Sequence, residues 1–204
     1  MTIVWLRHGE TALNAARVMQ PADTPLSARG LAQARAAAAR LRALRPAAIL
    51  ASDLPRARQT AEAVAAATGL PVSLDRSLRE RDFGLLRGRA WDTLGFDPSA
   101  LQEAPEGGES MADFHARASA AWALAVAQRR TLGGPLLVVS HGLLIHAALQ
   151  RHAHWPDGLT LPARLGNTSV SVVMAEAPHA VQRVDCTAHL EADLRPGHGS
   201  GAAA

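Results

Sequence analysis

Short apolar runs alternate with longer alanine-rich stretches along the chain. Four runs have the composition of strands, at residues 3–6, 47–50, 71–74 and 136–139, and two more follow at 170–174 and 181–184. Three stretches with helical composition lie at residues 28–44, 55–68 and 111–130. Continuous apolar strands suit a sheet covered on both faces, and strand–helix alternation favours parallel pairing. The pattern predicts an α/β protein, a three-layer α/β/α sandwich with a mostly parallel central sheet.

Helix-boundary signals support these limits. Gly69 and Pro71 follow the second helical stretch, and Ser110 with Asp113 forms a capping pair before the third. No internal repeat and no linker interrupts the chain. We therefore expect a single domain over residues 1–194, followed by a disordered tail at 195–204.

Composition places the chain among globular proteins. Of its 204 residues, 48% are apolar and 19% charged, which does not fit intrinsic disorder. No apolar run approaches the roughly 20 residues of a membrane span. Arg7 and His8 follow the first apolar run directly, so the N-terminus does not resemble a signal peptide. These features predict a cytoplasmic protein without a membrane partner.

The high isoelectric point does not indicate a nucleic-acid partner. The sequence pI is about 10.7, but the net charge is only +3. All 21 basic residues are arginine, and the chain contains no tyrosine, so almost nothing titrates between histidine and arginine. The arginines alternate with acidic residues instead of forming a basic block. The single cysteine, Cys186, excludes an intramolecular disulfide and a cysteine-rich zinc site.

Candidate chemistry lies where the predicted strands end. Arg7, His8 and Gly9 follow the first strand: a guanidinium suits phosphate oxygens, an imidazole can attack phosphorus, and glycine allows a close turn around a ligand. Arg56 and Arg58 lie at a helix start, where the helix dipole also attracts anions. His141 follows a further apolar strand. These cations would repel one another in one empty pocket, and a phosphate dianion would relieve that repulsion.

Taken together, the motifs are similar to those of a known family. The ordered set comprises Arg7-His8-Gly9-Glu10-Thr11, Asn14, Pro25-Leu26-Ser27 with Gly30, Ser52 to Thr60, Leu78 to Gly84, and Ser140-His141-Gly142. It resembles the histidine phosphatase, or phosphoglycerate-mutase-like, superfamily over residues 3–173. The resemblance implies the phosphoglycerate-mutase-like fold and, as partner, a small-molecule phosphate ester.

The resemblance also implies a role for each site residue. His8 is the expected nucleophile that becomes phosphohistidine. Arg7, Arg56 and His141 form the expected phosphate clamp, with Asn14 as a supporting donor. Glu80 resembles the proton donor, since a neighbouring phosphate dianion favours its protonated form. No metal and no cofactor is expected, because the side-chain cations supply the positive charge.

Two positions depart from the family pattern. Leu13 stands where the family often has tryptophan. The segment Gln20-Pro21-Ala22-Asp23 has proline in place of a glycine and a shortened spacing to the aspartate. Because proline lacks a backbone N–H, this substrate-facing loop loses a donor.

Other functions were compared with the phosphatase reading. A serine hydrolase lacks the glycine two positions before Ser140, and a zinc deaminase lacks its cysteine pair. His152 and His154, with His146 nearby, fit a polar loop better than a metal site. Within the family, the compact spacing after Glu80 favours a phosphatase over a phosphoglycerate mutase that depends on 2,3-bisphosphoglycerate. An inactive binding or regulatory module is the third reading, and both monomer and homodimer stay open.

Overall fold

A six-stranded sheet forms the centre of the molecule, for which a computed structural model describes residues 1–195. The strand order is β3-β2-β4-β1-β5-β6. β1 (Thr2–Arg7), β2 (Ala48–Ala51), β3 (Val72–Leu74) and β4 (Leu136–Ser140) run parallel. β5 (Val170–Met174) and β6 (Val181–Cys186) complete one edge in antiparallel pairing.

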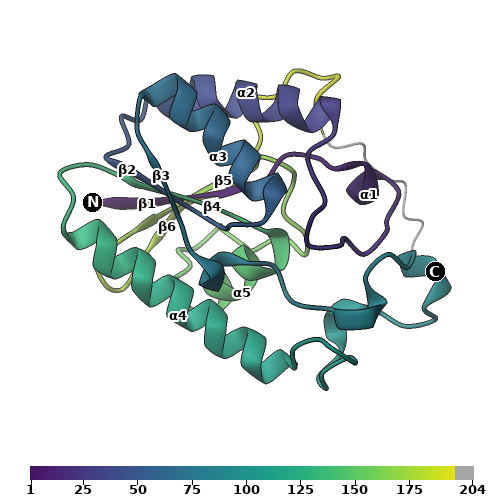
Figure 1. The fold of residues 1–204 in the computed structure, drawn as a ribbon. Helices are drawn as coiled ribbons and strands as arrows, with labels where there is room; N and C mark the ends of the chain where they lie inside the picture. The colour runs from purple at the N-terminus through teal and green to yellow at the C-terminus, as the bar shows by residue number, and fades with distance from the viewer. Residues whose placement is uncertain (196–204) are drawn as a thin grey trace.

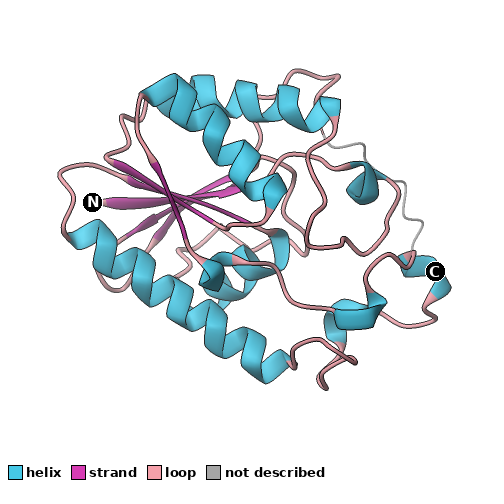
Figure 2. Cartoon of the chain, viewed as in Figure 1, coloured by secondary structure: helices cyan, strands magenta, loops and turns pink. Residues whose placement is uncertain are grey.

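Helices cover both faces of the sheet (Figures 1 and 2). α2 (Ala28–Arg42) and α3 (Pro55–Thr68) lie on one face, whereas α4 (Met111–Arg130) and α5 (Gly142–His152) lie on the other. Along β1, Ile3 and Trp5 pack into the core beneath α4 and α5, and Val4 and Leu6 pack into the core beneath α2 and α3. Both faces of β1 are thus buried, which explains its uninterrupted apolar sequence. The predicted α/β/α sandwich is confirmed.

The predicted boundaries agree closely with those of the structure. Gly69 ends α3 in the left-handed conformation at φ 75°. Ser110 caps α4 by accepting a hydrogen bond from the Asp113 N–H at 3.1 Å. The sequence reading missed α5, whose residues Leu143 to Leu149 are mostly apolar and therefore show little polar periodicity. It also missed the short helix α1 (Ala12–Ala15) and four 3₁₀ turns at Arg76–Leu78, Gly84–Leu86, Trp91–Thr93 and Pro98–Ala100.

Two arginines hold the segment between Leu78 and α4: Arg81 joins its start to its later part, and Arg117 joins its start to α4. Arg81 is buried and donates hydrogen bonds to the carbonyls of Ser99, Leu101 and Glu109. Arg117 on α4 donates to the carbonyls of Ser77, Arg79 and Glu80. The segment is thus folded back on itself, and its first residues are fixed against α4.

Gly9 meets Gly30 at a close backbone approach. A Cβ atom on Gly9 would lie 2.5 Å from the Gly30 carbonyl oxygen, and one on Gly30 would lie 1.9 Å from the Glu10 carbonyl oxygen. Both glycines are therefore required for α2 to pack against the loop after β1. This packing is a reason for Gly9 that is independent of any ligand.

Within residues 1–195, none of the helices combines the length and apolar character required to cross a bilayer. The single domain over residues 1–194 and the cytoplasmic location stay predictions. The predicted tail at 195–204 lies, apart from Arg195, outside the described residues.

Candidate active site

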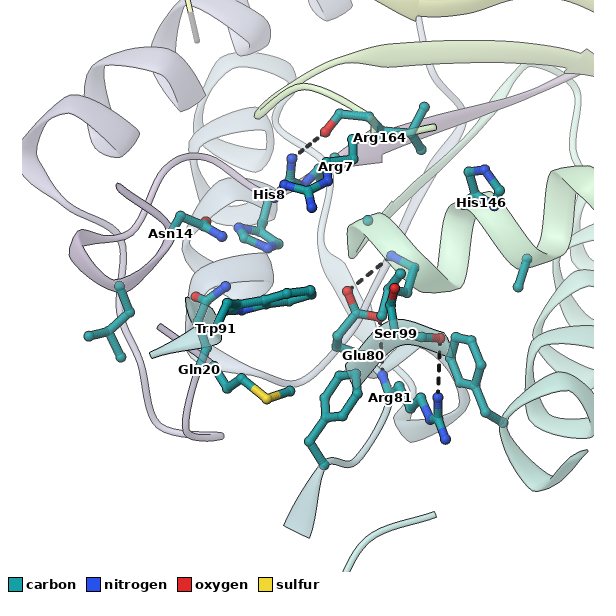
Figure 3. A pocket seen from close by; sticks show the side chains of 18 of the residues that line it. Arg7, His8, Asn14, Gln20, Glu80, Arg81, Trp91, Ser99, His146 and Arg164 are labelled. Atoms are coloured by element: carbon teal, nitrogen blue, oxygen red, sulfur yellow. Dashed lines mark hydrogen bonds between the residues drawn. The ribbon is translucent and has the colours of Figure 1, made fainter. Parts of the chain in front are cut away.

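A cavity of about 740 Å³ opens at the edge of the sheet where the parallel strands end. Its walls come from the loops after β1 and β2, the segment after Leu78, α5, and the loop before β5 (Figure 3). Five of the six predicted site residues line it: Arg7, His8, Asn14, Arg56 and Glu80.

The ring of His8 is held in one orientation by its own loop. Its Nδ1 lies 2.7 Å from the Gly9 carbonyl oxygen, which can only accept a hydrogen bond. Nδ1 therefore carries the proton of the neutral ring, and Nε2 keeps its lone pair. Burial lowers the pKa of His8 well below its ordinary value, and the charges of Arg56 and Arg7 lower it further. A neutral ring with a free Nε2 can act as a nucleophile.

Arg7 and Arg56 supply the positive charge beside His8. Arg56 is 2% exposed, and burial lowers its pKa to about 10, which still leaves it charged at neutral pH. One of its Nη atoms donates to the Pro21 carbonyl at 3.4 Å, and one of Arg7 donates to the Leu165 carbonyl. The Nε–H groups of both arginines are buried without a partner among the described residues. Such a pair of charged donors is suited to an anion.

Pro21 contributes its carbonyl to the site. Besides Arg56, this oxygen accepts a hydrogen bond from the Thr24 hydroxyl at 2.9 Å. Pro21 lacks the backbone N–H donor, as expected, but its carbonyl oxygen helps to place Arg56.

His141 lies beside His8 but outside the cavity lining. The two ring centroids are 5.1 Å apart, and His141 is fully buried. Its Nε2 lies 2.8 Å from the Ser52 hydroxyl oxygen, whereas its Nδ1 has no partner within residues 1–195. Burial, Arg56, His8 and Arg7 all lower the pKa of His141. Its contact with a phosphate stays a prediction.

Glu80 lines the cavity on the side opposite Asn14 (Figure 3). Its carboxylate accepts the N–H groups of Leu143 at 3.1 Å and Leu144 at 3.2 Å, in the first turn of α5. The Arg81 N–H donates to the same group at 3.1 Å. These three donors, two of them at the N-terminus of α5, fix the position of the carboxylate.

Asn14 is oriented by a residue that sequence reasoning missed. The Asn167 amide donates to the His8 carbonyl at 3.2 Å and to the Asn14 Oδ1 at 3.4 Å. Because Oδ1 is occupied, the NH₂ group of Asn14 remains as a donor. Asn167 precedes β5, and β5 is antiparallel to β1, so its beginning lies at the same edge as the end of β1. A search restricted to the carboxyl ends of strands could not find it.

Arg58, the second arginine expected at this helix start, does not line the cavity and pairs with Glu62 on the same helix, at 3.3 Å. Trp91 and His146 line the cavity, whereas Phe96 is exposed and does not.

The histidines considered as metal ligands do not gather around a site. His152 stacks on Trp122 and lies 2.8 Å from the Ser119 hydroxyl oxygen, whereas His154 is exposed on the loop after α5. Within the described part of the chain, no group of three or more His, Cys, Asp or Glu is placed to hold a metal ion.

Comparison with known proteins identifies the family. The model of the histidine phosphatase superfamily, branch 1, matches residues 3–184. The chain belongs to the histidine phosphatase superfamily. A probable phosphoglycerate mutase GpmB of Enterobacter sp. strain 638 is 37% identical over 181 residues, which cover 84% of this chain and 83% of the relative.

Solved structures of two phosphatases resemble this histidine phosphatase family member. A mycobacterial glucosyl-3-phosphoglycerate phosphatase is 34% identical with a TM-score of 0.70, covering 84% of this chain and 89% of its own. A putative alpha-ribazole-5'-P phosphatase of Escherichia coli is 25% identical with a TM-score of 0.77, covering 92% of this chain and 97% of its own. Fold and family are thereby established, and the family supports a phosphatase or mutase enzyme.

The Ser52 hydroxyl constrains the ring of His141 through a hydrogen bond. The Ser52 hydroxyl accepts the Leu54 N–H at 3.3 Å, so its own proton can go to His141 Nε2 and leave a proton on Nδ1. Ser52→Ala removes this constraint and leaves a buried ring nitrogen unpaired. We expect kcat/KM for a phosphate ester to fall roughly tenfold or more.

A second buried serine provides the control for Ser52. Ser140 is equally buried, but its hydroxyl donates to the Leu78 carbonyl at 2.7 Å. Ser140→Ala should lower thermal stability similarly and activity less. Equal activity losses in both variants would assign Ser52 a purely structural role.

Proposed function

We propose that the protein is a phosphomonoesterase that needs no metal ion and forms a phosphohistidine at His8. The observation that carries the proposal is the hydrogen bond from His8 Nδ1 to the Gly9 carbonyl, which leaves Nε2 as a nucleophile beside Arg7 and Arg56. In the proposed reaction, the ester phosphate binds between these arginines, with Asn14 and His141 as further donors. The guanidinium charges stabilise the charge that builds up on the phosphoryl oxygens.

The first proposed step transfers the phosphoryl group to the enzyme. Nε2 of His8 attacks phosphorus, and the bond between phosphorus and the leaving oxygen breaks. The carboxyl group of Glu80 gives its proton to that oxygen, so the product departs as an alcohol. The Gly9 carbonyl stabilises the positive charge on the phosphorylated ring through Nδ1–H.

The second proposed step returns the enzyme to its starting state. A water molecule attacks the phosphohistidine, and its proton passes to the Glu80 carboxylate. The bond between phosphorus and Nε2 breaks, inorganic phosphate leaves, and Nε2 regains its lone pair. Protonated Glu80 is then ready for another ester.

Hydrolysis is favoured over mutase activity by the short segment after Glu80. Only residues 81–110 separate Glu80 from α4, and Arg81 joins the start of that segment to its later part. The two phosphatase structures agree with this choice, whereas the relative named as a probable phosphoglycerate mutase favours the second candidate, phosphoryl return to bound phosphoglycerate. An inactive binding module is the least supported reading, because the cavity retains a complete set of reactive groups.

One experiment distinguishes these candidates. The protein is incubated in EDTA with 3-phosphoglycerate, both alone and with 2,3-bisphosphoglycerate, while inorganic phosphate and 2-phosphoglycerate are measured; 4-nitrophenyl phosphate serves as a reactive reference ester. We expect phosphate release to exceed isomerisation. Faster isomerisation would assign a mutase, activity that vanishes in EDTA would refute metal independence, and no turnover of any ester would favour the inactive module.

A further inference from the structure

Arg7 is held in place by a single peptide group. One of its Nη atoms donates to the Leu165 carbonyl (Figure 3), and among the described residues this is the one hydrogen bond that its guanidinium forms. A long, flexible side chain loses conformational entropy when it is fixed, so it keeps one position only where a bond compensates that loss. The position of the Leu165 carbonyl therefore decides where the Arg7 guanidinium lies beside His8.

The other side of the same peptide group contacts a carboxylate. The Gly166 N–H belongs to the peptide bond that also contains the Leu165 carbonyl, and it donates to Asp185 Oδ1 at 2.7 Å. The peptide group thus lies between a cation at its oxygen and an anion at its N–H. Consecutive hydrogen bonds polarise one another, and bonds to charged groups are stronger than neutral ones. One peptide bond therefore links Asp185 to Arg7.

A β-bulge directs Asp185 toward this peptide group. The register between β5 and β6 shifts around Ser171, so that both Val184 and Asp185 lie opposite this one residue. The φ of Asp185 is 49°, and its N–H donates to the Ser171 hydroxyl at 3.1 Å. Bulges redirect side chains and are common beside active sites, and a left-handed backbone is unfavourable for residues other than glycine. The unusual backbone at Asp185 thus indicates that the direction of its side chain has a role.

The charge of Asp185 also acts on Arg7. Burial is the main cause that lowers the pKa of Arg7, and the charges of Glu80 and Asp185 oppose that shift. In the proposed reaction Glu80 carries a proton during part of the cycle and then supplies no negative charge. Asp185 does not line the cavity and takes no part in that proton transfer. It is therefore the carboxylate that can stabilise the Arg7 cation throughout the cycle.

We propose that Asp185 is a positioning residue for Arg7: it holds the peptide group between Leu165 and Gly166, and through it the guanidinium that binds phosphate. The inference rests on the proposed phosphatase function and adds a residue that acts on the reaction without touching the substrate. The anion-binding end of the cavity then depends on the last strand of the sheet as well as on the loop after β1.

The test measures the affinity for inorganic phosphate by calorimetry and kcat/KM for 4-nitrophenyl phosphate. Asp185→Ala removes the acceptor of the Gly166 N–H. We expect roughly tenfold weaker phosphate binding and a similar loss in kcat/KM, the effect of losing one charged hydrogen bond. Asp185→Asn keeps an oxygen that can accept this N–H and should lose less than about threefold. Equal losses in the two variants would overturn positioning through this bond.

A double variant with Arg7→Gln separates positioning from general support of the fold. If Asp185 acts through Arg7, adding Asp185→Ala to Arg7→Gln should weaken phosphate binding or kcat/KM by less than about twofold, because the two changes remove the same interaction. If Asp185→Ala causes the same loss with and without Arg7, Asp185 has a purely structural role and the proposal is wrong.

Asp75 provides the matched control. Its Oδ1 accepts the Ser77 N–H, also at 2.7 Å, but it does not line the cavity, and this bond lies outside the turn that holds Arg7. Asp75→Ala should therefore leave phosphate affinity unchanged, and a loss equal to that of Asp185→Ala would refute the proposal.

Phosphate binding requires no turnover, so it separates this inference from the proposed function. A protein that hydrolyses no ester, yet binds phosphate in a manner that depends on Asp185, would refute the proposed hydrolysis and support the positioning role. A wild-type protein that does not bind phosphate would overturn both.

Discussion

The His8→Ala variant should lose phosphate-ester hydrolysis by roughly 10⁴-fold or more, the scale seen when a covalent nucleophile is removed. The neighbouring ring of His141 does not replace this nucleophile, because its own Nε2 is occupied by the Ser52 hydroxyl at 2.8 Å. The measurement is release of inorganic phosphate, together with trapping of a phosphoprotein that is labile in acid and stable in alkali. Wild-type protein should form that species, and the variant should not.

A second cavity histidine provides the control for His8. His146 lines the same cavity from α5, but it lies apart from His8 (Figure 3). His146→Ala should still form the acid-labile phosphoprotein. Phosphorylation that persists in His8→Ala would exclude His8 as the nucleophile.

The pH dependence of kcat/KM gives another measurement on His8. The reactive ring must be neutral, and burial with Arg56 and Arg7 holds the pKa of His8 well below 6.5 in the free enzyme. As the pH falls through 6.5, the ring therefore stays unprotonated, and the acidic decline caused by His8 should begin only at lower pH. A decline centred near 6.5 that disappears in His8→Ala would contradict the depressed pKa.

Local patterns were sufficient to predict the sheet and most helices. The buried strands are short and mostly apolar, and Gly69 and Ser110 mark helix ends through backbone rules that act within a few residues. α5 escaped detection because its first two turns are almost wholly apolar, and its few polar side chains, such as His146 and Gln150, line the cavity. Its sequence resembles a buried strand as much as a helix, so the periodicity did not decide between them.

The reaction centre was more predictable than the rest of the cavity. Arg7, His8 and Arg56 directly follow or begin regular elements, so topology alone brings them to one edge. The pairing of residues 17–19 with 88–91 joins segments about seventy positions apart and has no local signature. Asn167 was missed because it precedes β5, the strand that runs antiparallel to β1. The positions of cavity residues outside the reaction centre thus depend on long-range contacts, whereas those of Arg7, His8 and Arg56 depend on the sheet.

Glu80→Gln should affect esters according to the basicity of their leaving group. The variant keeps a side chain of similar shape but cannot donate a proton from a carboxyl group. An alkyl phosphate such as glycerol 3-phosphate needs that proton, and its kcat should fall by roughly 10²- to 10³-fold, within the usual contribution of general acid catalysis. A 4-nitrophenyl ester releases a weakly basic phenolate, so its phosphorylation step should fall less than about tenfold. Burst kinetics separate that step from hydrolysis of the phosphohistidine.

The ratio between these two losses distinguishes acid catalysis from structural support. Glu80 accepts N–H groups from Leu143, Leu144 and Arg81, so the amide in Glu80→Gln also disturbs the start of α5. Such a disturbance changes the cavity for both esters and should lower both rates by a similar factor. A missing proton, in contrast, slows only the ester whose leaving group is strongly basic. Equal losses would therefore mean that Glu80 holds α5 in place without protonating the product, whereas a ratio of tenfold or more would identify it as the acid.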